Sequence, residues 1–219
     1  MARTMTPGTA ISLLQAKYRQ LPDGFGARFC DEIHSHMWLR YAWRESIEEL
    51  PPFHLTDGEA YYGPPLLAVP PDYYSLHEAW LVSANYDQHP LKIQANLTPT
   101  MATGWPNKIG YDKARGSFVL SPRPSVTAPD WWVTGVYKKN PAKITNNNLN
   151  SYTLPWDDVY YEVFRTGVEW KFKEEISRDK DWPLVRQAFY GLLGEMAVAE
   201  GVAEGVTQIV PEFGLEYGG

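Results

Sequence analysis

The sequence predicts an α+β protein: a four-helix bundle built from N- and C-terminal helices, with an inserted antiparallel β domain and an extended C-terminal tail. Apolar residues recur with helical spacing near both ends of the 219-residue chain, whereas short β-prone runs with Pro, Gly and Asn fill its middle. The final segment is rich in glycine and has no helical period. Because the strands do not alternate with the helices, a parallel α/β fold is disfavoured.

Residues 1–52 are expected to supply the N-terminal helices of the bundle. Thr6-Pro7 opens the first helix, since a capping residue precedes Pro at the first helical position. The second helix is expected from about Ala27 to Leu50, where Pro51-Pro52 should stop it. Its apolar stripe, with steps of four residues, is Phe29, Ile33, Met37 and Tyr41.

Residues 53–155 are expected to form the β-rich insertion. The runs 109–111 and 117–120 flank a five-residue connection that ends in Gly116, which is typical of a β-hairpin. The stretch from Ile144 to Pro155 is expected to be a polar loop. The candidate strands are Leu66 to Val69, Leu76 to Val82, Leu91 to Asn96, Ile109 to Tyr111, Ser117 to Leu120 and Trp131 to Lys138.

Residues 156–200 are expected to supply the C-terminal helices, and residues 201–219 the extended tail. The first of these helices has an apolar row of Tyr160, Phe164, Val168 and Phe172. The opposite face should be a solvated charge ladder of Glu162, Arg165, Glu169 and Lys173. The last helix should run from Trp182-Pro183 to about Glu200.

Composition excludes several classes of protein. The chain has 20 basic and 26 acidic side chains, a net charge of −6, so it is a poor candidate for tight binding to a phosphate backbone. Its single cysteine, Cys30, excludes an intrachain disulfide framework. No signal peptide is predicted, because the start, MARTMTPGTA, lacks an apolar core, and no membrane span is predicted, because no run approaches about 18 consecutive apolar residues.

The titratable residues do not predict a metal, a cofactor or a catalytic site. His34 and His36 are two apart on a predicted helix and therefore cannot share one metal ion. His54, His77 and His89 have no metal-binding motif around them. The adjacent carboxylates Glu48-Glu49, Asp157-Asp158 and Glu174-Glu175 fall near predicted helix ends, where capping and solvation explain them better than catalysis.

Aromatic residues are abundant, with 9 Trp, 14 Tyr and 8 Phe. Such residues suit cores, subunit interfaces and sugar-binding faces alike. Five of them in the β region could form a sugar-stacking platform, although filling a sheet face is the commoner role. They are Tyr73, Tyr74, Trp105, Trp131 and Trp132.

The order of several segments resembles the head-to-tail adaptor, or connector, proteins of tailed bacteriophages over about residues 10–200. A helix rich in Trp and Tyr, SHMWLRYAWRESIEEL, is followed by TDGEAYY and LLAVPPDYYSLHEAWL. Within these segments Trp43, Tyr61 or Tyr62, and the run from Val69 to Tyr73 match the adaptor pattern. The later matching segments are GSFVLSPRP, WWVTGVYKKNP and SYTLPWDDVYYEVFRTGVEWKFKEE.

The resemblance implies a structural virion protein with no catalytic activity. It would form a ring of twelve subunits beneath the portal protein, extend the channel through which DNA passes transiently, and present a platform to the tail or nozzle protein. It would lie in the virion neck, between capsid vertex and tail, after synthesis in the bacterial host cytoplasm. The alternatives are a cell-wall-degrading (muralytic) enzyme, for which no Glu and Asp pair can be nominated, and a carbohydrate-binding module.

The C-terminal tail is the predicted partner-binding segment. Its glycines disfavour a helix, yet five of its residues are too apolar for an inert solvated end. We expect these anchors to bind the portal or a neighbouring subunit; the alternative is that the tail folds back over the core of its own chain. They are Ile209, Val210, Phe213, Leu215 and Tyr217.

Overall fold

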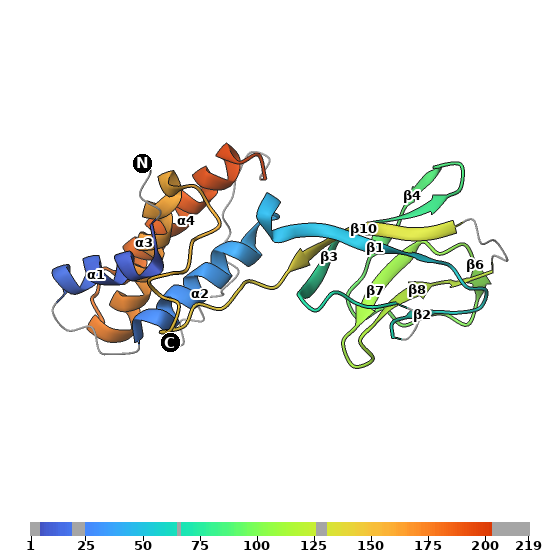
Figure 1. The fold of residues 1–219 in the computed structure, drawn as a ribbon, viewed down its shortest axis with the longest axis horizontal. Coiled ribbons are helices and arrows are strands. Elements are labelled where there is room, and N and C mark those ends of the chain that lie inside the picture. The colour runs from blue at the N-terminus through green and yellow to red at the C-terminus, as the bar shows by residue number, and fades with distance from the viewer. Residues whose placement is uncertain (1–4, 19–24, 65–66, 126–130, 203–219) are drawn as a thin grey trace, which may run out of the picture. The chain divides into compact units, whose positions relative to one another are not determined.

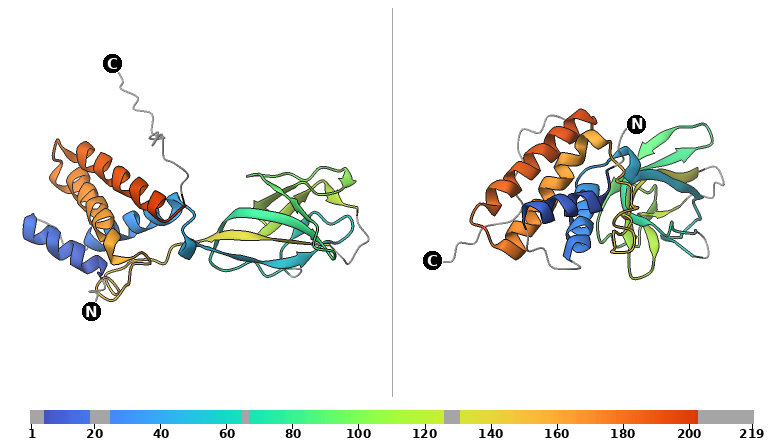
Figure 2. Two further views of the ribbon diagram at one scale, coloured as in Figure 1. Left: turned by 90° about the horizontal axis from the view of Figure 1, so that it is seen from above. Right: turned by 60° about the vertical axis from the view of Figure 1, so that its left-hand side comes forward.

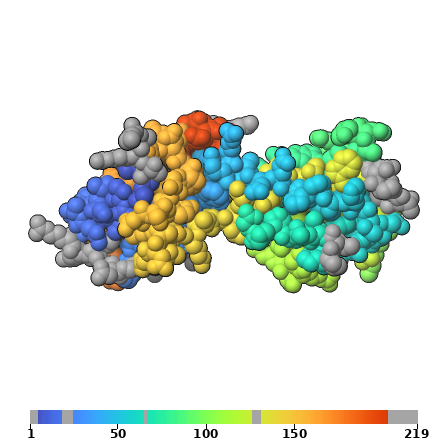
Figure 3. All heavy atoms as spheres, in the orientation of Figure 1, coloured from blue at the N-terminus to red at the C-terminus, as the bar shows by residue number. Residues whose placement is uncertain are grey.

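The computed structural model describes residues 5–18, 25–64, 67–125 and 131–202 (Figure 1). The chain divides into two compact units. The helical unit combines the residues up to Trp43 with those from Pro141 onward, and the β unit comprises Arg44–Asn140. Within each unit, side chains fill the space between the helices or strands (Figure 3).

The helical unit contains four α-helices: α1 (Pro7–Lys17), α2 (Phe25–Arg40), α3 (Tyr161–Phe172) and α4 (Trp182–Ala199). A 3-10 helix, Asp158–Tyr160, precedes α3, and a π-helical turn, Lys173–Ser177, follows it. Helix α3 packs against α1, α2 and α4, and lies side by side with α4 in both views of Figure 2. A Cβ atom on Gly167 of α3 would lie 2.7 Å from Ile33 of α2 and 2.8 Å from Phe189 of α4, so glycine permits this close approach.

The prediction that the N- and C-terminal helices form a four-helix bundle is wrong. A bundle requires each helix to turn one apolar stripe toward a shared centre. Instead, nine of the twelve residues of α3 are buried, because the other helices surround it. The fold is α+β, with four α-helices and ten strands in mainly antiparallel sheets among the described residues.

The predicted boundaries of the second helix and the predicted charge ladder also need correction. Helix α2 ends at Arg40, and Ile47–His54 forms strand β1 instead of continuing the helix to Leu50. Two members of the predicted ladder, Glu169 and Lys173, are only 7% and 8% exposed. They are buried because α1 and the start of α4 supply polar partners for them.

Glu169 is the centre of a buried polar network between α1 and α3. The Lys17 ammonium donates to its Oε1 atom over 2.7 Å, and the Tyr18 hydroxyl donates to the same atom over 2.9 Å. Arg165 lies 3.8 Å from the Oε2 atom. Burial alone would raise the pKa of Glu169, but the hydrogen bonds from Lys17 and Tyr18 outweigh it and lower the pKa below its ordinary value.

The network predicts a pH-dependent contribution of Glu169 to stability. Because the pKa is lower in the folded than in the unfolded chain, this contribution is complete above the unfolded value of about 4.3 and is lost as the pH falls through the folded pKa. Glu169→Gln should therefore lower the free energy of unfolding by about 1–3 kcal/mol near neutral pH. Urea melts of both proteins at several pH values would measure this difference, which should shrink in acid.

The matched control for this prediction is Glu162→Gln on the same helix, since Glu162 is exposed and pairs only at the surface with Arg165. That change should cost at most about 0.5 kcal/mol. An equal loss in the two variants, or a Glu169→Gln effect that does not depend on pH, would contradict the prediction.

The β unit has two four-stranded sheets. The first, in the order β1-β10-β3-β4, is antiparallel and contains β1 (Ile47–His54), β10 (Trp131–Lys139), β3 (Tyr73–Ser83) and β4 (Gln88–Pro90). The second, in the order β2-β8-β7-β5, contains β2 (Tyr61–Tyr62), β8 (Ser117–Ser121), β7 (Lys108–Asp112) and β5 (Lys92–Ile93). Strands β6 (Thr103–Gly104) and β9 (Arg123–Pro124) form a separate parallel pair.

The strands of the β unit pack around one buried core, and the structure confirms some of the predicted strands. Phe53, Leu81, Phe118 and Val133 belong to one buried cluster. The predicted hairpin is confirmed as β7 and β8, with Ile109 opposite Leu120. The run predicted at 91–96 keeps only two strand residues, and Asn96 has a left-handed backbone with φ 54°. Residues 67–69, in the first predicted run, are not a strand.

Candidate functional site

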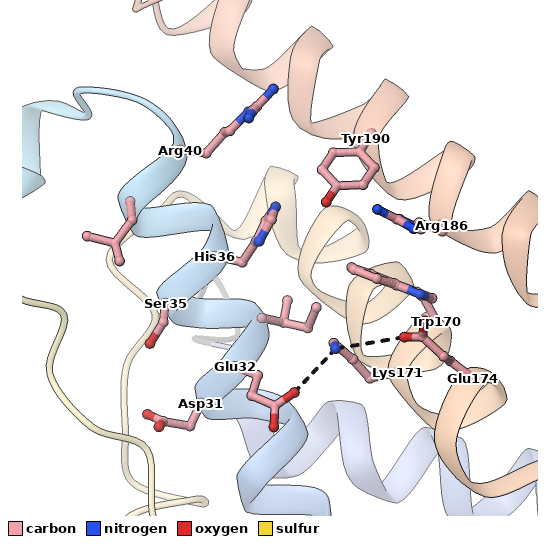
Figure 4. A pocket seen from close by; sticks show the side chains of 12 residues that line it. Asp31, Glu32, Ser35, His36, Arg40, Trp170, Lys171, Glu174, Arg186 and Tyr190 are labelled. Carbon is pink, nitrogen blue, oxygen red and sulfur yellow. Dashed lines mark ion pairs between the residues drawn. The ribbon is translucent and has the colours of Figure 1, made fainter. Parts of the chain in front are cut away.

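The helical unit contains a groove of about 820 Å³, which we call the helical groove (Figure 4). Helix α2 supplies one wall, while α3, the turn after it and α4 supply the other. Its lining residues are Asp31, Glu32, Ile33, Ser35, His36, Leu39, Arg40, Trp170, Lys171, Glu174, Arg186 and Tyr190. Side chains that are far apart in the sequence therefore meet in one site.

Three cationic side chains line the groove. Lys171 lies 3.4 Å from Glu32 and 3.8 Å from Glu174, measured from Nζ to a carboxylate oxygen. The Arg186 guanidinium lies over the Trp170 ring, 5.4 Å from its centroid. Arg40 is exposed at the end of α2 and makes no ion pair with a described residue. The groove therefore places positively charged side chains next to an aromatic ring.

His36 lies where these cations converge. Its ring makes edge contacts with Trp170 and Tyr190, at centroid distances of 6.4 and 5.4 Å. Burial lowers the pKa of His36, and the charges of Arg40, Lys171 and Arg186 lower it further. The imidazole is therefore neutral at pH 7, so it adds no fourth positive charge.

Two buried ring nitrogens of the groove residues have no hydrogen-bond partner among the described residues. They are Nε2 of His36 and Nε1 of Trp170. A buried polar atom without a partner is uncommon in folded proteins and calls for an explanation, such as a bound group. The cations of the groove suit a ligand that carries negative charge and hydrogen-bonding oxygens.

The other histidine of α2 lies outside the groove lining. His34 is fully buried, and its Nε2 atom lies 3.1 Å from the Tyr152 hydroxyl. Burial lowers the pKa of His34 to about 4, so this ring is neutral as well. In the described part of the chain, no three potential metal ligands lie together.

The three adjacent carboxylate pairs have different surroundings. Glu48-Glu49 lies on strand β1, and Glu48 is 3.2 Å from Lys139. Asp158 accepts a hydrogen bond from the Met5 backbone, but Asp157 makes no side-chain capping bond at the start of the 3-10 helix. The capping explanation for this pair is therefore wrong for Asp157.

Glu174 and Glu175 were expected on a solvated face, but they are half-buried and form ion pairs. Glu175 pairs with Arg28, and both glutamates lie 3.8 Å from Lys171. Glu174 also lines the helical groove. Packing of α2 against α3 brings these partners together.

The aromatic residues singled out in the β region do not form one platform. Tyr73 packs on the core residues Phe118 and Tyr137. Trp132 contacts His54 at a centroid distance of 6.2 Å, whereas Tyr74 is simply exposed. The remaining pair is closer, with Trp105 and Trp131 in a T-shaped contact at 4.6 Å.

Trp105 and Trp131 form a small surface cluster with His89. The Trp105 side chain is 52% exposed. The His89 ring stacks on Trp131 with a centroid distance of 5.7 Å and an interplanar angle of 28°. We call these three residues the aromatic cluster; they are the part of the predicted platform that the fold brings together.

The predicted tail anchors lie outside the described residues: Ile209, Val210, Phe213, Leu215 and Tyr217.

Sequence reasoning missed the helical groove. The spacing of Glu32, His36 and Arg40 at steps of four residues places them on one face of α2, and this was the available signal.

No described helix is long and apolar enough to cross a membrane. No protein-family model matches the chain, and no curated protein matches it.

Proposed function

We propose that the protein is a structural connector of a tailed-bacteriophage virion, with no catalytic role. In this proposal it is a head-to-tail adaptor, which forms a ring of twelve copies between the portal and the tail or nozzle protein and extends the DNA channel. The proposal starts from the resemblance in segment order over about residues 10–200. The structural observation that best supports it is the helical groove, because a groove of charged and aromatic side chains suits docking of a polypeptide segment.

The charge of the chain is compatible with this role. Each contact between a cation and a DNA phosphate adds attraction through counterion release, and such contacts would retard DNA that must pass through a channel. A chain with net charge −6 limits that attraction. DNA would therefore be a transient, non-specific partner, and the virion neck would be the site of action.

The proposal is tested by measuring assembly. Sedimentation velocity and negative-stain imaging would be applied to the purified chain, alone and with the portal protein of the phage that encodes it. Twelve copies of the 25.0 kDa chain should add about 300 kDa to the portal, in a ring coaxial with it. A chain that stays monomeric and does not bind the portal would contradict the proposal.

The aromatic cluster favours a second candidate, a carbohydrate-binding module. An exposed indole beside another ring can stack on the apolar face of a sugar. Binding to purified peptidoglycan should then be lost in Trp105→Ala but kept in Tyr86→Ala, a control at another exposed aromatic residue. Release of soluble sugar in the same assay would favour the muralytic enzyme instead.

A further inference from the structure

The two ends of the helical groove differ in charge (Figure 4). At one end, the negative charges of Glu32 and Glu174 lie beside the positive charge of Lys171. At the other end, Arg40 and Arg186 lie near the neutral ring of His36. The groove therefore offers positive charge in one half and net negative charge in the other.

This distribution favours a polypeptide with carboxylates over a nucleic acid. A polyanion would meet the acidic side chains of Asp31, Glu32 and Glu174 at one end of the groove. Base stacking is also disfavoured, because Trp170 is only 5% exposed and Arg186 lies over its ring. A short segment with spaced carboxylates and apolar side chains would match both the cations and the apolar surface of Leu39 and Tyr190.

The chain itself contains a segment of this chemistry. Residues 203–219 include three glutamates and no Lys or Arg. Two of the glutamates, Glu212 and Glu216, each precede an aromatic residue, Phe213 and Tyr217. In an extended segment, carboxylates four residues apart are separated by about 13 Å along the chain. In the sequence of this segment, a glutamate followed by an aromatic residue therefore occurs twice, four residues apart.

We propose that the helical groove binds residues 209–217 of a second copy of the chain. The carboxylates of Glu212 and Glu216 pair with Arg40 and Arg186, and the neighbouring aromatic side chains cover the apolar surface of the groove. The inference rests on the proposed function, since a connector built from repeated copies needs a contact that links one copy to the next. Such a contact is heterologous, and repeated around an axis it closes a ring.

The first test uses a fluorescent peptide of residues 203–219 and full-length chains as receptors. The receptor carries Glu212→Arg and Glu216→Arg, so that its own segment does not compete for the groove. Saturable binding, read by fluorescence anisotropy, is expected. Adding Arg40→Glu and Arg186→Glu to the receptor should weaken binding about tenfold or more, because like charges would then face each other.

The matched control receptor carries Lys180→Glu, a charge reversal at an exposed residue outside the groove, and should bind like its parent. Circular dichroism would verify that every receptor is folded. A peptide with Glu212→Arg and Glu216→Arg should bind a receptor that carries Arg40→Glu and Arg186→Glu but keeps Glu212 and Glu216, so that its own segment does not compete for the reversed groove. Absence of saturable binding, or equal binding to the normal and reversed grooves, would overturn the inference.

The second test asks whether the segment links two copies. Sedimentation velocity would compare two full-length proteins, one with the reversed groove and one with the reversed segment, separately and mixed. Association only in the mixture is expected, because each protein then meets a complementary charge. Peptide binding without association in the mixture would mean that the segment returns to its own copy, and would overturn the link between copies.

These outcomes can be distinguished from failure of the connector proposal. A protein with Arg40→Glu and Arg186→Glu that still forms a ring on the portal would overturn the groove contact and leave the connector role intact. Peptide binding and copy association in a chain that never binds the portal would support the groove contact and contradict the connector role.

Discussion

Replacing Phe164 with alanine is expected to lower the free energy of unfolding of the helical unit by about 3–5 kcal/mol. Phe164 is 1% exposed and belongs to the core cluster that also contains Phe29 and Phe189. Because α1, α2 and α4 all pack around α3, the surrounding side chains have little freedom to fill the space that the ring leaves. The loss therefore combines transfer of the ring to water with the cost of a cavity.

Denaturant melts followed by helical circular dichroism would measure this loss. The matched control is Leu184→Ala on α4, because Leu184 is 67% exposed and its removal leaves no cavity. That variant should differ from the parent by at most about 0.5 kcal/mol. Similar losses in the two variants would mean that Phe164 is not a core residue.

The second large effect is expected in the β unit, from Gly135→Ala. Gly135 lies on β10 opposite Ala79 of β3. A Cβ atom there would lie 2.3 Å from the carbonyl oxygen of Glu78 and 3.0 Å from the Cα atom of Ala79. Both are backbone atoms, so relief requires the two strands to move apart. We expect a loss of about 3 kcal/mol, at the upper end of the range for overpacked sites.

Gly191→Ala is the matched control for this glycine. Gly191 lies within α4, and an added Cβ atom would meet nothing within 4 Å. Alanine favours a helix by about 0.5–1 kcal/mol over glycine, so this change should raise stability. Melts of the β unit, followed by tryptophan fluorescence, would give the sign and size for Gly135→Ala. A protein with Gly135→Ala that is as stable as its parent would contradict the prediction.

Local sequence signals predicted the elements whose determinants are local. Helices α1 and α4 begin at Pro7 and Trp182-Pro183 as predicted, since proline suits the first turn of a helix. The hairpin of β7 and β8 needs only two β-prone runs and a short connection with Gly116, whose φ is 62°. Each signal lies within a few residues of the element that it determines.

Strand β1 shows why other elements could not be predicted. Its sequence, IEELPPFH, contains glutamates and a Leu that continue the helical pattern, followed by two prolines. It becomes a strand by pairing with β10, whose residues come about 80 positions later in the chain. The prolines are accommodated because β1 is an edge strand and its register shifts between Leu50 and Phe53.

Predicting the helical groove would likewise have required knowledge of contacts between residues that are far apart in the sequence. Steps of four residues place His36 and Arg40 together on α2, but no local pattern shows that Trp170 and Arg186 face them. Likewise, the spacing of Glu169 and Lys173 indicated a solvated face. The sequence did not show that their partners, Lys17 and Asp181, belong to other elements. Helical periodicity shows on which side of a helix a residue lies, but it does not show which other element packs against that side.

The division of the helical unit into two stretches of sequence has a consequence for protein synthesis. Helices α1 and α2 leave the ribosome before α3, and the whole β unit is translated in between. At about 5–20 residues per second, this interval lasts on the order of ten seconds. During it, Phe29, Ile33 and Met37 lack the surface of α3 that will bury them, whereas the β unit, one continuous stretch, can complete its own core. Nascent chains are therefore most prone to aggregate through their N-terminal helices, before translation reaches Phe172.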